Sequence, residues 1–232
     1  MIEERGKLCD ETNSCVLDRY IENIQHTNID GKEKMYLIID AIIDLCELIR
    51  NIHKKGKYCI NLVPSKVRCS ENKLQLLGIN SFMTKEQLYK KINVGNVKGY
   101  IAPEVIMYEG FCVNGTFVDG QKADIFCIGS LLYWSVTGKR IHFLQNQYNF
   151  DSHGIYVEQV VDYEKVKKLL VCHRYLQCLR EDIHKKYCTD NSLDLKILEE
   201  IFLKSLCRNV DRRYENIEQM LKKLELFKKK LC

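Results

Sequence analysis

The segment from Lys122 to Val136 is apolar at most of its positions, and this constrains the fold more than any other feature. A helix that is apolar on every side leaves no face for water and belongs in the middle of a domain. We therefore expect a buried helix here, ended by Thr137-Gly138 because glycine readily closes a helix. With 46% hydrophobic residues, the 232-residue chain can build one sizeable core around that helix.

Amphipathic helices are expected on both sides of this segment. Between 15 and 24, the apolar residues that share one side of a helix are Leu17, Tyr20, Ile21 and Ile24. A longer helix should run from about Lys32 to His53 and stop before Gly56. Its apolar positions follow the 3.6-residue period and are Ile38, Ile42, Leu45, Cys46, Ile49 and Ile52. Three further helices are predicted near 158–187, 194–207 and 215–230.

One small β-hairpin is expected after the long helix. Val67-Arg68-Cys69 and the alternating run 73–77 flank a turn at Glu71-Asn72. Ala102-Pro103-Glu104-Val105 should open a short helical piece, and the loops are expected at 81–100, 109–121 and 139–157. The predicted fold class is therefore mainly α with one small β-hairpin, in a single domain from 15 to 230 that follows a loose segment, 1–14.

Charge and hydropathy limit the cellular setting. No apolar run approaches the roughly 18 residues that a membrane span needs. The acidic N-terminus, 1–5, lacks the apolar stretch of a secretory signal, which predicts a cytoplasmic or nuclear protein. The net charge is +5, and Lys228-Lys229-Lys230 lies near the C-terminus. Because aromatic residues do not interleave with this basic tail, we interpret it as a solvated helix end, with no nucleic-acid partner.

The 12 cysteines are spread over the whole chain, unlike those of a small disulfide scaffold. No two of them are separated by only two residues, which is the spacing typical of zinc sites. The nearest approach to a metal cluster is Cys172-His173, Cys178, His184 and Cys188, in which only His184 and Cys188 have helical i,i+4 spacing. We expect reduced, mostly buried thiols, and zinc in the 172–188 region stays open as the alternative.

The order of the expected elements, together with six short motifs, resembles the C-terminal lobe of a eukaryotic protein kinase over about residues 15 to 228. Each motif alone is weak, but all six follow in kinase order on the expected elements. They are Ile52-His53-Lys54-Lys55-Gly56 before the catalytic loop, Leu62-Val63-Pro64-Ser65-Lys66-Val67 within it, Leu76-Leu77-Gly78-Ile79-Asn80 at the Asp-Phe-Gly position, Gly99-Tyr100-Ile101-Ala102-Pro103-Glu104 at the end of the activation segment, Lys122-Ala123-Asp124-Ile125-Phe126 with Gly129 and Thr137-Gly138 in the central helix, and the segment from Cys207 to Arg213.

The resemblance implies structural roles for the motif residues that are retained, which are Ala102, Pro103, Glu104, Asp124, Gly129 and Arg213. Glu104 and Arg213 would form the buried ion pair that ties the activation segment to the far end of the lobe. Asp124 would accept hydrogen bonds from the backbone of the catalytic loop.

The same resemblance implies that catalysis is lost. Asn61 stands in place of the catalytic aspartate, and an amide cannot accept a proton as a carboxylate can. Lys66 replaces the metal-binding asparagine, where a cation repels magnesium, and Gly78 replaces the metal-binding aspartate. No glycine-rich loop precedes the long helix, so the matching region begins after the N-terminal lobe. We expect no enzyme activity, no ATP, no metal and no cofactor.

These expectations favour a pseudokinase-like interaction protein, a scaffold or decoy in signalling whose partner is another protein, first of all a protein kinase. The composition, rich in Ile, Lys, Asn, Tyr and Cys, fits an AT-rich genome such as that of a large DNA virus or a protist. Gly78 is shared with truncated viral pseudokinases that resemble mixed-lineage kinase-like proteins, which would place the protein in a host cytoplasm. The docking surface is expected near the hairpin and residues 15–24, left apolar without an N-terminal lobe, or around 140–190.

Three alternatives stay open. The first is a kinase non-catalytic C-lobe module, as in Spire-type actin nucleators, which binds a basic peptide of its partner. The second is a remnant of a serine/threonine kinase without function. The third is a residual enzyme whose missing lobe is supplied by another chain; a nucleophile at Cys59 or Cys127 is disfavoured because the sequence places no histidine base beside either.

Overall fold

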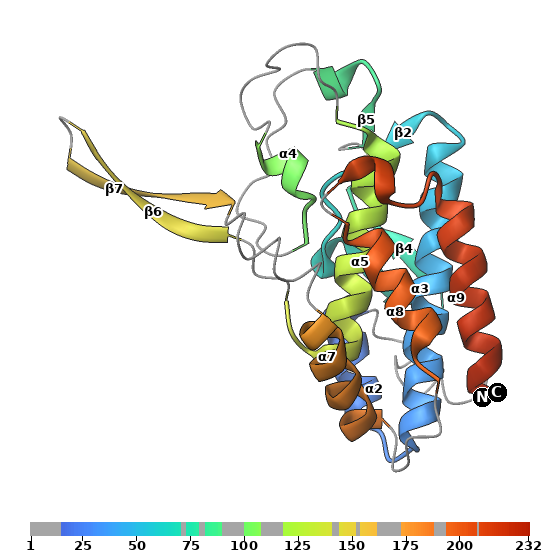
Figure 1. Cartoon of the computed structure of the whole chain (residues 1–232). Helices are drawn as coiled ribbons and strands as arrows, with labels where there is room; N and C mark the ends of the chain where they lie inside the picture. Colours follow the sequence, from blue (N-terminus) through green and yellow to red (C-terminus); the bar gives the residue numbers. More distant parts are fainter. Residues whose placement is uncertain are drawn as a thin grey trace.

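The computed structural model describes residues 15–70, 73–78, 82–89, 100–107, 118–140, 144–151, 154–161, 173–187, 194–207 and 209–232. The predicted loose segment 1–14 lies outside these residues. The described part is mainly helical (Figure 1). Its α-helices are α2 (Leu17–His26), α3 (Gly31–His53), α4 (Pro103–Met107), α5 (Gly120–Thr137), α7 (His173–Tyr187), α8 (Lys196–Ser205) and α9 (Ile217–Leu231). Short 3-10 turns occur at η1 (Pro64–Lys66), η3 (Gln87–Tyr89) and η4 (Val210–Arg212).

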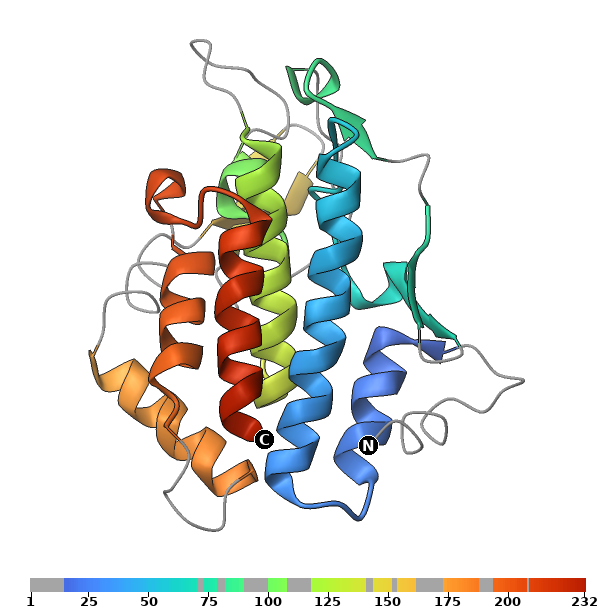
Figure 2. The same ribbon diagram turned by 90° about the vertical axis from the view of Figure 1, so that its right-hand side faces the viewer.

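Helix α5 lies in the middle of the helical body, as its apolar sequence predicts. It contacts α3, α7, α8 and α9, and α9 packs in turn along α3 and α8 (Figure 2). Fourteen of its residues are buried, among them the polar Asp124, Ser130 and Ser135. The Asp119 carboxylate caps its N-terminus by accepting from the N–H of Lys122 at 3.1 Å. Gly138 closes the helix with a φ of +73°, a left-handed conformation in which glycine carries no steric penalty.

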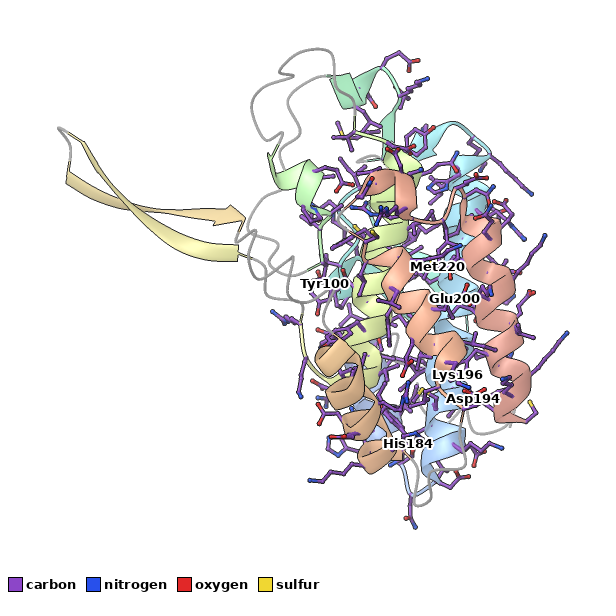
Figure 3. The ribbon with its side chains drawn as sticks, viewed as in Figure 1. Tyr100, His184, Asp194, Lys196, Glu200 and Met220 are labelled. Atoms are coloured by element: carbon purple, nitrogen blue, oxygen red, sulfur yellow. The ribbon has the colours of Figure 1, made fainter. Side chains whose placement is uncertain are left out.

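The predicted helices on either side of α5, apart from the first part of the one expected at 158–187, are confirmed. Helix α2 buries Leu17, Tyr20, Ile21 and Ile24, as its periodicity indicated. Helix α3 begins because Asp30 accepts from the N–H groups of Lys32 and Glu33, at 2.7 and 3.2 Å. Glu200 of α8 reaches toward α9 (Figure 3), where the Nζ of Lys223 lies 2.8 Å from its carboxylate.

Gly129 allows α5 and α8 to approach each other closely. A Cβ atom at this position would lie 2.3 Å from the Oγ of Ser205 and 2.7 Å from its Cβ, closer than van der Waals contact permits. Ser205 is fully buried and Gly129 is buried, so a larger residue at 129 would push the two helices apart.

Replacing Gly129 by alanine should therefore lower the free energy of unfolding by about 1–3 kcal/mol through overpacking. Urea unfolding followed by circular dichroism measures this. Ser135→Ala on the same helix is the matched control, because it removes a buried hydroxyl that has no hydrogen-bond partner among the described residues and adds no atoms. Equal stability of Gly129→Ala and the wild type would contradict the close approach.

The predicted β-hairpin is present as β3 (Val67–Ser70) and β4 (Lys73–Leu76), although its turn at 71–72 lies outside the described residues. A third strand that the sequence did not predict, β1 (Cys15–Val16), pairs antiparallel with β3 and places Cys15 opposite Cys69. A separate pair joins β2 (Lys57–Tyr58) to β5 (Met83–Thr84). These strands lie beside α2 and α3, at one side of the helical body (Figure 2).

The predictions for 139–187 were partly wrong. Instead of a loop at 139–157 and a helix from 158, two eight-residue strands form a second hairpin, β6 (Leu144–Asp151) and β7 (Gly154–Val161). The helix expected at 158–187 is described only from His173 to Tyr187, as α7. Asparagine is depleted in strands. Because Gln145, Asn146, Gln147 and Asn149 are all polar, β6 lacks the clear alternation of apolar and polar residues that predicts a strand.

Within the described residues, the surface around the first hairpin does not show the apolar patch that the sequence predicted. Among the residues the structure describes, the exposed large hydrophobic side chains are Leu203 and Leu226, which lie on α8 and α9. On β3 and β4 the exposed positions are Arg68, Lys73 and Gln75. Within the described ranges, no helix is both long enough and apolar enough to cross a bilayer.

Candidate functional site

The candidate site begins at Asp124, in the second turn of α5. Its side chain is completely buried. The Oδ2 atom accepts from the N–H of Cys59 at 2.9 Å and the Oδ1 atom accepts from the N–H of Ile60 at 2.6 Å. The Nε2 atom of His53, at the end of α3, lies 2.8 Å from Oδ2. One carboxylate thus joins α5, α3 and the segment at 59–61, the position that the sequence motifs assign to a catalytic loop.

Ile60 holds a strained backbone conformation within this segment. Its φ is +48°, a region that β-branched residues rarely adopt. The N–H of Asn61 donates to the carbonyl of Cys59 at 2.6 Å, so residues 59–61 form a tight three-residue turn. Strain of this kind persists only where surrounding contacts enforce it. The two hydrogen bonds to Asp124 are such contacts, and they fix the turn from the core side.

The kinase resemblance assigned catalytic positions to Asn61, Lys66 and Gly78, of which Asn61 ends this turn and Lys66 contacts it. The ammonium of Lys66 donates to the backbone carbonyl of Asn61 at 2.9 Å, and burial lowers its pKa below the usual range. Gly78, two residues after β4, has a φ of +72° and offers no side chain to a cation. These positions therefore hold the ammonium of Lys66 and the amide of Asn61, whereas Mg²⁺ prefers carboxylate oxygens.

The second part of the site is the ion pair between Glu104 and Arg213, which is present as predicted. Glu104 lies in the first turn of α4 and Arg213 follows η4. The guanidinium donates from Nη1 to Oε1 at 2.6 Å and from Nη2 to Oε2 at 2.8 Å. The Arg213 side chain has no exposed area, and that of Glu104 is 12% exposed. Such a bidentate pair fixes both distance and orientation.

Arg213 also satisfies two backbone carbonyls. Its Nε donates to the carbonyl of Cys207 at 2.7 Å, and its Nη1 donates to that of Lys122 at 3.0 Å. The guanidinium lies 4.8 Å from the ring centroid of Phe126, close enough for a cation–π contact. One side chain therefore connects α4, α5 and the segment before α9.

Both clusters meet at the first two turns of α5, which carries Asp124 and supplies the Lys122 carbonyl. Of the remaining motif residues, Ala102 is buried beside this end of α5 and Pro103 begins α4, where its fixed φ suits a first helical position. Gly129 lies further along α5 and serves packing. The contact between His53 and Asp124 was not predicted from the sequence, although His53 belongs to one of the six motifs. The two residues are 71 positions apart, and no local pattern connects them.

The buried thiols near Asp124 are poor nucleophiles. Burial, followed by the charge of Asp124, raises the pKa of Cys127 to about 12 and raises that of Cys59 as well. Both thiols remain protonated at neutral pH, and the thiolate is the reactive form. Cys46, Cys59, Cys69 and Cys127 are buried as expected, and the seven cysteines whose side chains the structure describes form no disulfide.

The structure leaves the zinc alternative at 172–188 undecided, because Cys172 and Cys188 lie outside the described residues. The described residues do not bring three or more histidine, cysteine or acidic side chains together as a metal site.

Comparison with known proteins gives this chain no assignment. No protein-family model matches its sequence, and none of the curated proteins matches it either.

Proposed function

We propose that this protein is a catalytically inactive protein kinase-like C-lobe that acts as a scaffold or decoy and binds another protein, first of all a protein kinase. The observation that carries the proposal is the contrast between two sets of residues. The contacts that build the lobe, at Asp124 and between Glu104 and Arg213, are all formed. The positions that would perform phosphoryl transfer hold Asn61, Lys66 and Gly78 instead.

This contrast argues for a retained fold that has a use other than catalysis. Phosphoryl transfer depends on positioned charges around the phosphates and metal ions. A kinase-like lobe that lacks these charges can still present the surface through which kinases bind one another or their substrates. We place such a decoy in the cytoplasm, or in a host cytoplasm if the chain is viral.

The alternative of a peptide-binding C-lobe module receives less support from the surface. Such modules bind a basic peptide and require an acidic face. The C-terminal turn of α7 carries His184, Lys185 and Lys186, and that of α9 carries three lysines. Figure 3 shows His184 at the lower end of the helical body, on the side where α9 also ends. Lys228 and Lys230 form ion pairs with Asp40 and Asp194, so this end of the body is not the acidic face that a basic peptide would need.

Adding ATP with magnesium should leave the melting temperature of the purified chain unchanged. A ligand present at 100 times its Kd stabilises a protein by about 2.7 kcal/mol, which is readily seen as a thermal shift. We expect no such shift, because Lys66 and Gly78 stand where two metal ligands are needed. An active protein kinase measured in parallel is the positive control, and EDTA separates metal-dependent from metal-independent effects. A magnesium-dependent shift with ATP would overturn the inactive assignment.

A further inference from the structure

The β6–β7 hairpin projects from the helical body, away from the other strands (Figure 1). Its two strands pair residue for residue, from Leu144 opposite Val161 to Asp151 opposite Gly154, without a bulge. In the described part of the chain these two strands form a sheet of their own. A hairpin of two strands is only marginally stable in water, and further strands or a packed face are normally needed.

Neither strand carries the residues that usually protect a sheet edge. Natural edges are blocked by lysine, by proline or by bulges that twist the edge away. The chain contains 36 lysines and arginines, yet 144–151 and 154–161 contain neither of these residues and no proline. In the described part of the chain, neither outer edge of the hairpin is paired with a further strand.

Most of the apolar residues of β6 and β7 lie on one face of this hairpin. Alternate residues of a strand lie on one face, and the register pairs even-numbered positions of β6 with odd-numbered positions of β7. The apolar residues of that shared face are Leu144, Tyr148, Phe150, Ile155, Val157 and Val161. The other face holds mostly polar residues, including Gln147 and Glu158. Asn146 and Gln159 lie opposite each other on the same face, so a wider sheet built on this hairpin would have one mainly apolar face.

Of the two edges, β6 is the one suited to pair with a second copy of itself. Around a two-fold axis at Tyr148, antiparallel pairing places Tyr148 opposite Tyr148, Asn146 opposite Phe150 and Gln147 opposite Asn149. Its single charged residue, Asp151, then stands opposite Gln145. Strand β7, in contrast, contacts α4 of its own chain.

We propose that two copies of this chain associate through their β6 edges and form a four-stranded antiparallel sheet. Aromatic pairs across a ladder stabilise a sheet, and the added strands supply the support that each hairpin lacks on its own. The interface is isologous, as a two-fold dimer requires.

Sedimentation equilibrium of the full chain tests this proposal. We expect the wild type to sediment as a dimer, with twice its mass of 27.3 kDa. Tyr148→Lys places two cations at the axis and should shift the chain to monomer. The matched control is Val157→Lys, which introduces the same residue on the same face, directly opposite Tyr148 but on the strand away from the interface. It should remain dimeric.

Three results would overturn the proposal. The first is a wild-type chain that stays monomeric at every concentration. The second is a dimer that Tyr148→Lys leaves intact, because the interface then lies elsewhere. The third is that both lysine variants lose the dimer equally. In that case a lysine on either strand would act by unfolding the hairpin, and the β6 edge would not be shown to form the interface. Circular dichroism of each variant shows that the helical body is still folded.

Discussion

Replacing Arg213 by alanine should lower the free energy of unfolding by about 3–5 kcal/mol, the range observed when one partner of a buried ion pair is removed. The substitution leaves the carboxylate of Glu104 without its cation. It also removes the donors of two backbone carbonyls, those of Cys207 and Lys122. Urea unfolding followed by circular dichroism measures the loss as a lower midpoint at an unchanged slope.

Arg180→Ala is the matched control for this prediction. Arg180 forms a bidentate pair with Glu199 at 2.7 and 2.9 Å, nearly the geometry of the Glu104–Arg213 pair, but its side chain is 49% exposed. The Glu199 side chain is 12% exposed, as is that of Glu104, so the two pairs differ in the exposure of the arginine. Because water screens the exposed Arg180, we expect a loss of at most about 1 kcal/mol. If the two arginine variants lost equal stability, burial would not be the cause.

Replacing Asp124 by alanine should have a comparable effect, a loss of about 3–5 kcal/mol. The N–H groups of Cys59 and Ile60 would be left buried without an acceptor, and each such group costs about 1–3 kcal/mol. Asn at 124 should not rescue stability, because its amide NH₂ would face one of these donors. The same unfolding measurement applies.

Asp119→Ala is the control at the same end of α5. This exposed residue caps the helix through one hydrogen bond, and loss of a cap costs about 1 kcal/mol. An Asp124→Ala variant no less stable than Asp119→Ala would show that the carboxylate does not hold the turn at 59–61.

Much of the helical body could be predicted from local patterns. The all-apolar run of α5 and the 3.6-residue period of α3 reflect burial that extends over several turns, so each appears directly in the sequence. The ends of these helices also follow from local chemistry, as at Gly138. The β6–β7 hairpin escaped prediction because polar residues such as Asn146 and Gln147 occupy strand positions whose structure depends on pairing.

The site was predictable only where a motif linked distant residues. Glu104 and Arg213 are 109 residues apart, and only the kinase resemblance suggested that they meet. The part that His53 has at Asp124 was missed because no local pattern connects them. The strained turn could not be predicted either, since isoleucine at position 60 disfavours a positive φ. Contacts with Asp124 override that local preference.

The proposal that this lobe binds a protein kinase is tested most directly by affinity purification of the tagged chain from cytosol, followed by quantitative mass spectrometry. We predict that one protein kinase is enriched over a tag-only control and that the two purified proteins re-form the complex. If the folded chain enriches no protein kinase, or if the enriched kinase does not bind it in purified form, the central claim is contradicted.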